Sequence, residues 1–190
     1  ALTSLGVYGV ILAGWASNNK WSIYGAMREA CQMVSYEIPL GMSIIVAVMA
    51  AGTLNMVQLG HIQAGGLHTW VIFRNPFTFL AFFLYFVASL ASNKRAPFDL
   101  PESESELVAG FHTEYSSMTF GLFFLGEYAN MILLSAMGAI LFLGGWMSPI
   151  PYAPFTWVPG LVWFALKIAF LLFVFSWTKG TLPRYRYDQL

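Results

Sequence analysis

Five apolar stretches constrain the fold of this chain more than any other feature of its sequence. They cover residues 1–16, 33–54, 76–92, 118–146 and 158–177. At 1.5 Å per residue, each of the last four reaches about 25 Å or more as a helix, enough to cross the hydrocarbon core of a bilayer. The first is shorter, and we interpret it as a clipped span. Because a helix satisfies its own backbone hydrogen bonds in lipid, the sequence predicts an all-α membrane bundle of about five transmembrane helices, forming a single, partial domain over residues 1–190.

The scarcity of charged residues supports the same class. Apolar residues make up 58% of the chain and charged residues only 9%, whereas about 25% is usual in a soluble domain. Lipid is therefore expected to cover much of the surface. The net charge of zero gives no indication of nucleic-acid binding. With one cysteine, Cys31, the chain cannot supply the thiolates of an iron–sulfur cluster, so any electron carrier is expected in another subunit.

The basic residues orient the predicted spans. Seven lie on the side that includes the loop 93–117, whereas the opposite side holds only Arg74. The positive-inside rule makes the first side cytoplasmic. Six of the seven tryptophans fall at or near predicted span ends, as is typical of residues at a membrane interface. The seven basic residues are Lys20, Arg28, Lys94, Arg95, Lys179, Arg184 and Arg186.

The loop 93–117 carries the strongest compositional anomaly. Five of the nine carboxylates lie within residues 99–114, namely Asp99, Glu102, Glu104, Glu106 and Glu114. They could form a solvated first helical turn, stabilised by up to about 1 kcal/mol through the helix dipole. They could instead line a partly buried cavity, where neighbouring carboxylates resist simultaneous ionisation and take up protons. The leucine and aromatic residues that follow favour the cavity.

Three ionisable residues lie within predicted spans: Glu37, Glu127 and Lys167. Each costs about 2.5 kcal/mol or more at the centre of a span, so such residues usually face the bundle interior and serve a path or a site. Glu37 precedes Pro39, which is expected to kink its helix. Glu127 could instead lie near the headgroups. Lys167 is too deep to reach the interface easily, so we expect a carboxylate or carbonyl partner on another helix.

The remaining charges on the predicted cytoplasmic side are candidates for a docking surface or for routine interface charges. They are Arg28 with its neighbour Glu29, Arg95, Arg184, Arg186 and Asp188. On the other side, His61 and His68 are seven residues apart. Because no cysteine or carboxylate joins them, we interpret them as surface histidines and expect no metal site.

Several segments together resemble one family. The chain is similar, over nearly its whole length and in order, to the quinone-site membrane component, or H subunit, of the NADH:quinone oxidoreductases of respiratory complex I. The weakest stretch is 52–73. The acidic run with its HTEY continuation is the most specific part. The matching segments are 15–20 (WASNNK), 35–39 (SYEIP), 95–102 (RAPFDLPE), 104–110 (ESELVAG), 112–115 (HTEY) and 186–190 (RYDQL).

The resemblance implies a non-redox subunit in a bacterial inner membrane, with FMN and iron–sulfur clusters in partner subunits. Quinone is the expected substrate, at a site shared with soluble iron–sulfur subunits on the cytoplasmic side; small membrane subunits are expected laterally. The loop matched by Asp99, Glu102, Glu104, Glu106 and Glu114 borders the quinone cavity. Glu37 and Glu127 belong to an intramembrane proton path, in which we also place Lys167. The family's first helices have no counterpart here, and a last span is expected after Leu190.

Other classes stay open at this point. The homologous membrane subunit of an energy-converting hydrogenase or a ferredoxin-linked quinone oxidoreductase shares much of this pattern, although the continuation at 107–115 (LVAGFHTEY) favours complex I. A stand-alone proton-coupled transporter is expected to show inverted repeats or paired broken helices. Only one predicted span, 33–54, is interrupted by proline.

Overall fold

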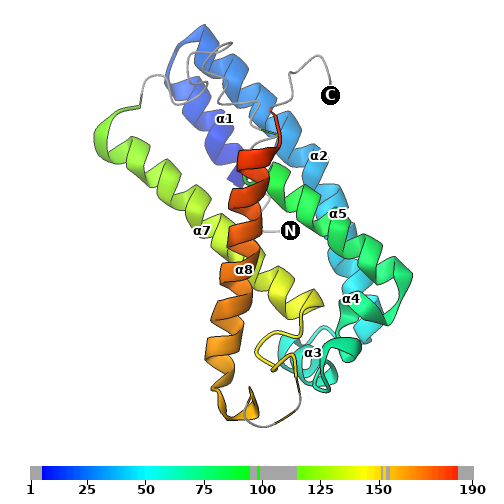
Figure 1. Cartoon of the computed structure of the whole chain (residues 1–190). Helices are drawn as coiled ribbons and strands as arrows, with labels where there is room; N and C mark the ends of the chain where they lie inside the picture. The colour runs from blue at the N-terminus through cyan, green and yellow to red at the C-terminus, as the bar shows by residue number, and fades with distance from the viewer. Residues whose placement is uncertain (1–5, 95–97, 99–114, 151, 153–154, 184–190) are drawn as a thin grey trace. The chain divides into compact units, whose positions relative to one another are not determined.

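A computed structural model of the chain describes residues 6–94, 98, 115–150, 152 and 155–183, and these residues contain helices and no strand (Figure 1). The long helices are α1 (Gly6–Ala16), α2 (Lys20–Ala51), α5 (Pro76–Ser92), α7 (Ser117–Phe142) and α8 (Gly160–Thr181). Two short α-helices, α3 (Met56–Ile62) and α4 (Val71–Arg74), and two 3₁₀ turns, η2 (Leu67–Thr69) and η4 (Phe155–Trp157), lie in the connections. The predicted all-α class is confirmed.

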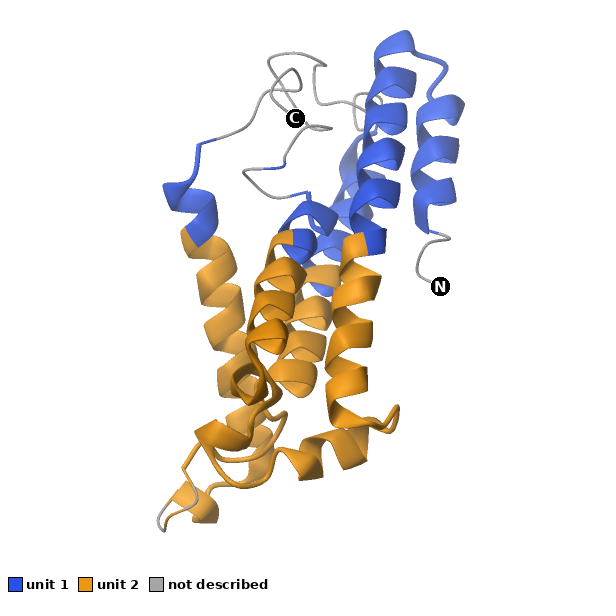
Figure 2. Ribbon diagram, turned by 90° about the vertical axis from the view of Figure 1, so that its right-hand side faces the viewer, with its two compact units in different colours: residues 1–38, 88–129, 178–190 blue, residues 39–87, 130–177 orange. Residues whose placement is uncertain are grey.

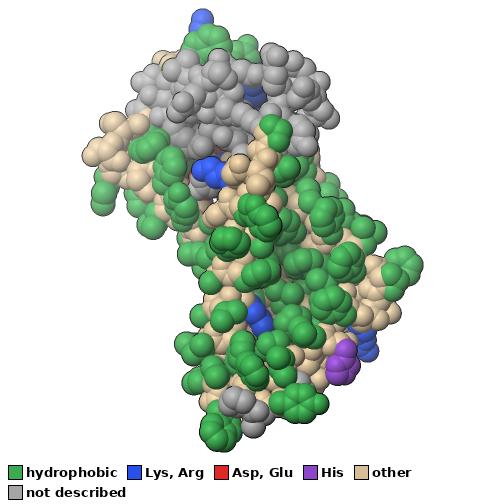
Figure 3. All heavy atoms as spheres, viewed as in Figure 1, with side chains coloured by type: hydrophobic (Ala, Val, Ile, Leu, Met, Phe, Trp, Pro, Cys, Tyr) green, Lys and Arg blue, Asp and Glu red, His purple; other side chains and the backbone are tan. Residues whose placement is uncertain are grey.

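Three helices, α2, α7 and α8, are long and apolar enough to cross a membrane. The helices α1 and α5 are apolar but shorter. Large apolar side chains lie on the outside of these helices: Leu161 is 78% exposed and Phe173 is 64% exposed on α8. Apolar side chains also cover much of the described surface in the view of Figure 3. A surface of this kind is suited to lipid rather than to water, which confirms the integral membrane class.

The helix α2 begins at Lys20, well before the apolar stretch at 33–54. Asn19 caps this start, because its side-chain oxygen accepts a hydrogen bond from the backbone N–H of Trp21 at 3.1 Å. The first half of α2 buries one stripe of small and polar residues at helical spacing. These residues are Ser22, Gly25, Ala26, Glu29 and Ala30. The stripe packs inward although it is not apolar, which explains why hydropathy alone does not find this part of the helix.

The described chain divides into two compact units (Figure 2). Unit 1 comprises residues 1–38, 88–129 and 178–190. Its apolar core contains Val10, Ala13 and Ala26, and Tyr115 and Phe123 pack against it. The Tyr115 hydroxyl donates a hydrogen bond to the Ala13 carbonyl at 3.2 Å, which ties Tyr115, two residues before α7, to α1.

Unit 2 comprises residues 39–87 and 130–177. Its core is built from α2, α3, α4, α5 and α7, and includes Leu59, Trp70, Tyr85 and Phe142. Gln63, which is fully buried, fastens the connection between α3 and α4: its amide donates to the Ile140 carbonyl at 3.0 Å, and its oxygen accepts from the Val71 N–H. Residues 53–74 are therefore packed against the helices of unit 2.

Candidate functional site

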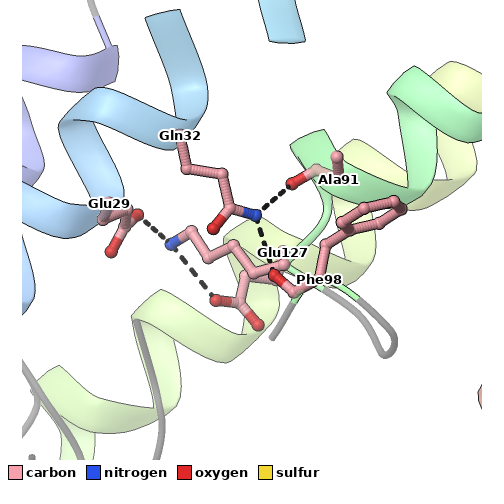
Figure 4. A network of polar contacts seen from close by, with 6 residues as sticks. Glu29, Gln32, Ala91, Phe98 and Glu127 are labelled. Carbon is pink, nitrogen blue, oxygen red and sulfur yellow. Dashed lines mark hydrogen bonds and ion pairs between the residues drawn. The ribbon is translucent and has the colours of Figure 1, made fainter. Parts of the chain in front are cut away.

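Three charged side chains meet inside unit 1. Glu29 lies on the buried stripe of α2, and Glu127 lies on α7 (Figure 4). Lys94 follows the end of α5. The Lys94 ammonium forms an ion pair with Glu29 and lies 3.3 Å from Glu127 Oε1. We refer to Glu29, Lys94 and Glu127 as the charge triad. The Glu29 side chain has no exposed surface, and those of Lys94 and Glu127 are 11% and 10% exposed.

The triad brings one cation to two carboxylates, so its formal charge is −1 when all three groups are ionised. Burial alone would lower the pKa of Lys94, but the negative charges of Glu29 and Glu127 outweigh it and leave that pKa above its ordinary value. Lys94 is therefore protonated throughout the physiological pH range. With a dielectric constant of about 20, the attraction between Lys94 and Glu127 is about 5 kcal/mol before desolvation is subtracted. Removing one partner of such a buried pair typically costs about 3–5 kcal/mol.

The backbone of Lys94 adopts a conformation that lysine rarely takes. Its φ angle is +52°, and its N–H donates to the Ala91 carbonyl at 3.2 Å, in the turn that ends α5. Glycine is the usual residue at such a helix end. A residue with a Cβ costs about 1–2 kcal/mol there. The ion pairs of the Lys94 side chain offset this cost.

Gln32, one turn along α2 from Glu29, holds the chain on both sides of Lys94. Its amide nitrogen donates to the Ala91 carbonyl at 3.0 Å and to the Phe98 carbonyl at 2.8 Å. The Tyr36 ring, one further turn along, packs on Phe98 with 5.4 Å between ring centroids. Glu29, Gln32 and Tyr36 therefore form one face of α2, which binds Lys94 and the residue that precedes the acidic segment. The buried oxygen of Gln32 accepts no hydrogen bond from the described residues.

Unit 2 contains a different buried cation, Lys167 on α8, which is 6% exposed. Its ammonium donates to the carbonyls of Gly145 at 2.9 Å and Met147 at 2.8 Å, and lies 4.6 Å from the centre of the Trp70 ring. The expectation of a carbonyl partner is thus met, although both carbonyls belong to the turn after α7 rather than to a helix. Gly144 in this turn has φ +76°, and a Cβ there would lie 2.7 Å from Trp70 Nε1. Glycine therefore lets the turn reach both the indole and the lysine.

The structure brings together only some of the residues singled out in the sequence. Glu127 belongs to the charge triad. Glu37 is half-buried on α2, and no hydrogen bond or ion pair of the described residues involves it; Arg28 is also half-buried. Residues Asp99, Glu102, Glu104, Glu106, Glu114, Arg95, Arg184, Arg186 and Asp188 lie outside the described residues. Across the described part of the chain, no group of three or more histidine, cysteine or acidic residues could hold a metal ion.

Sequence reasoning misses the other two members of the triad. The interpretation of Glu29, with Arg28, as a routine interface charge is wrong for Glu29, since it is completely buried against Lys94. In the sequence, Lys94 is used only as one of the seven basic residues that orient the predicted spans by the positive-inside rule. The available signal is the spacing of Ser22, Ala26 and Glu29, which puts the carboxylate on the same face as two small residues that pack inward.

Comparisons with known proteins agree with the motifs. The family model described as NADH dehydrogenase matches residues 1–190. Similar proteins, each named as the H subunit of NADH-quinone oxidoreductase, occur in Rhodospirillum centenum (56% identical over 190 residues), Rhodospirillum rubrum (54% over 190) and Erythrobacter litoralis (51% over 193). Each alignment covers 100% of this chain and 55% of the relative, so the chain spans about half the length of these relatives. A match along the whole chain confirms the resemblance, and the chain belongs to the NADH dehydrogenase family.

Proposed function

We propose that this chain is part of the H subunit of a proton-translocating NADH:quinone oxidoreductase in a bacterial inner membrane. In this proposal it forms part of the quinone cavity and passes the effect of quinone reduction to the proton-translocating part of the enzyme. It binds no redox cofactor by itself. FMN and iron–sulfur clusters belong to soluble partner subunits on the cytoplasmic side, and small membrane subunits lie beside it in the bilayer. The proposal extends the names of the relatives to this chain.

The observation that carries the proposal is the buried charge triad. A carboxylate buried beside a second carboxylate and a cation responds strongly to any change of charge nearby, because little water screens it. Two-electron reduction of quinone to quinol consumes two protons and changes the charge next to the cavity. Glu127 on α7 and Glu29 on α2 can respond to this change in charge by taking up or releasing a proton. A purely structural anchor would gain little from three ionisable groups that cost several kcal/mol to bury.

The proposed site residues have distinct roles. Asp99, Glu102, Glu104, Glu106 and Glu114 border the quinone cavity and exchange protons with it. Glu37, Glu127 and Lys167 belong to the intramembrane path. Arg28, Arg95, Arg184, Arg186 and Asp188 form the docking surface for the soluble subunits. Among these, Glu127 has the most specific support, since it is the predicted path residue that the described contacts join to another ionisable group.

The first test is to tag the chain in its native membrane, extract it gently, and identify the proteins that co-purify. Recovery with flavin- and iron–sulfur-bearing subunits and inhibitor-sensitive NADH:quinone activity supports the proposal. Recovery with a nickel–iron subunit would assign the chain to a hydrogenase instead. Recovery of an intact, folded protein without partners would revive the transporter hypothesis.

The second test replaces Glu127 by glutamine in the assembled complex and measures protons translocated per NADH oxidised in sealed vesicles. We expect this ratio to fall, because the glutamine side chain has the shape of the acid but no exchangeable charge. The matched control is Tyr128→Phe, which changes the adjacent, exposed residue of the same helix. A normal ratio in fully assembled Glu127→Gln enzyme would refute the role of Glu127.

A further inference from the structure

Lys94 and Glu29 form a second, unassigned part of the site, because the family motifs point to Glu127 and to the acidic segment but to neither of these residues. Glu29 is completely buried, so its negative charge depends on a cation within the protein rather than on water or salt. Lys94 supplies such a cation, and it also reaches Glu127. One ammonium therefore serves two carboxylates that belong to two different helices.

Resting on the proposed function, we propose that Lys94 is a movable counter-charge that binds Glu29 and Glu127 alternately as a proton moves on and off the triad. The two carboxylates share the Lys94 ammonium, so one of them can become neutral while the other keeps it. The lysine side chain has a flexible four-carbon stem and a compact charge with three donors, which suits it to exchanging acceptors. Because its ammonium already contacts both carboxylates, the exchange requires only a small movement.

The proton transfer balances without an electron carrier. A proton arrives from a protonated carboxyl group or a hydronium ion; the O–H bond of that donor breaks as a new O–H bond forms on Glu127. Lys94 keeps its three N–H bonds and binds Glu29. In the reverse step Glu127 loses the proton to the next acceptor, and the attraction of Lys94 stabilises the carboxylate that forms. Lys94 is thus a positioning residue, which acts through the charge of the two acids.

The surroundings of Lys94 fix the turn in which it lies. Gln32 binds the carbonyls of Ala91 and Phe98, which precede and follow Lys94 in the chain. The left-handed backbone at Lys94 gives its turn a conformation that depends on the side chain being bound. The turn that carries Lys94 is therefore held from both sides by one amide of α2.

The test compares Lys94→Met, Lys94→Arg and the double variant Glu29→Gln/Lys94→Met in the assembled complex. The double variant removes the buried pair together, so no uncompensated charge of Glu29 prevents folding. We expect Lys94→Met and the double variant to lower the ratio of protons translocated to NADH oxidised about tenfold, because ionised Glu127 loses the ammonium that lies 3.3 Å from it. Lys94→Arg keeps a positive charge and is expected to retain most of the ratio. Lys179→Met is the control, since Lys179 is exposed at the end of α8.

A merely structural ion pair gives a different result. If the double variant assembles and translocates protons at the normal ratio, Lys94 is not a counter-charge for Glu127 and the inference is wrong. Structures of the Glu29→Gln and Glu127→Gln complexes give a second readout: Lys94 should bind the remaining carboxylate in each, and its departure from the site in either variant would overturn the inference. Failure of the proposed function can be told apart from failure of this inference. In the first case, the unmodified complex would itself not translocate protons when quinone is reduced.

Discussion

Replacing Lys167 by Met is predicted to destabilise unit 2 although it removes a charge from a membrane helix. The ammonium of Lys167 is the hydrogen-bond donor to the carbonyls of Gly145 and Met147. It also lies over the Trp70 ring, at 4.6 Å from its centre. Methionine has a similar length and flexibility but no donor, so it fills the space and leaves both carbonyls unsatisfied.

The expected loss of unfolding free energy in Lys167→Met is the sum of three contributions. The two carbonyls, one buried and one partly buried, cost about 1–3 kcal/mol each without a donor, and the lost contact with the indole costs about 2 kcal/mol when desolvated. Against these losses, removing an ammonium from the interior of a span saves about 3 kcal/mol. The net loss of unfolding free energy is therefore about 1–5 kcal/mol, with about 3 kcal/mol as the central value.

The assay is detergent-driven unfolding of the purified chain in lipid–detergent micelles. Lys179→Met is the control, because it makes the same chemical change at an exposed position of the same helix and is expected to alter stability by less than about 0.5 kcal/mol. An unchanged unfolding free energy in Lys167→Met would refute the reasoning from the two carbonyls. Proton translocation per NADH, measured on complex that does assemble, then tests the proposed path role of Lys167 separately.

Three further predictions concern neighbouring contacts. Gln32→Leu is expected to cost about 2 kcal/mol in the same unfolding assay, since two hydrogen bonds to carbonyls are lost at about 1 kcal/mol each. An unchanged unfolding free energy would contradict a stabilising role of these two hydrogen bonds. Gly138→Val is expected to cost about 1–3 kcal/mol by overpacking, because a Cβ at Gly138 lies 3.0 Å from Tyr85 Cε1, whereas at the control, Gly126→Ala, it meets nothing within 4 Å. The raised pKa of Lys94 means that its stabilisation is complete below the unfolded value of 10.5 and is lost only as the pH rises through the folded value. Lys94→Met should therefore lower stability equally at about pH 6 and 9, and a loss that shrinks markedly at the higher pH would contradict a charged Lys94.

The fold class was predictable because it depends on averages along the chain. Helix α5, for example, coincides with the apolar stretch at 76–92, and lipid requires a helix wherever such a stretch crosses it. The start of α2 was not predictable in this way. Its first half packs through Ser22, Ala26 and Glu29, whose burial depends on partners that are far away in the sequence.

The candidate site, too, was predictable from the sequence only in part. Glu127 stands out in the sequence because an acid within an apolar stretch is unusual and costly. Glu29 and Lys94 lie outside the apolar stretches, where charged residues are common, so their charge does not distinguish them, and only the helical spacing of Glu29 from Ser22 and Ala26 gives a local signal. Their importance comes from a tertiary contact between α2, the turn after α5, and α7. A single sequence contains no record of that contact.

The two buried lysines differ in a way that bears on how such a protein handles protons. Lys167 is bound by backbone carbonyls, which cannot take up a proton at any physiological pH, so its surroundings keep one fixed charge state. Lys94 is bound by carboxylates, each of which can be neutralised by one proton and recharged when the proton leaves. Only the second arrangement lets a nearby change in charge alter the number of protons held without unpairing the cation. The partners of Lys94 therefore suit it to the proposed proton exchange, whereas the path role proposed for Lys167 would depend on groups other than the two carbonyls that bind it.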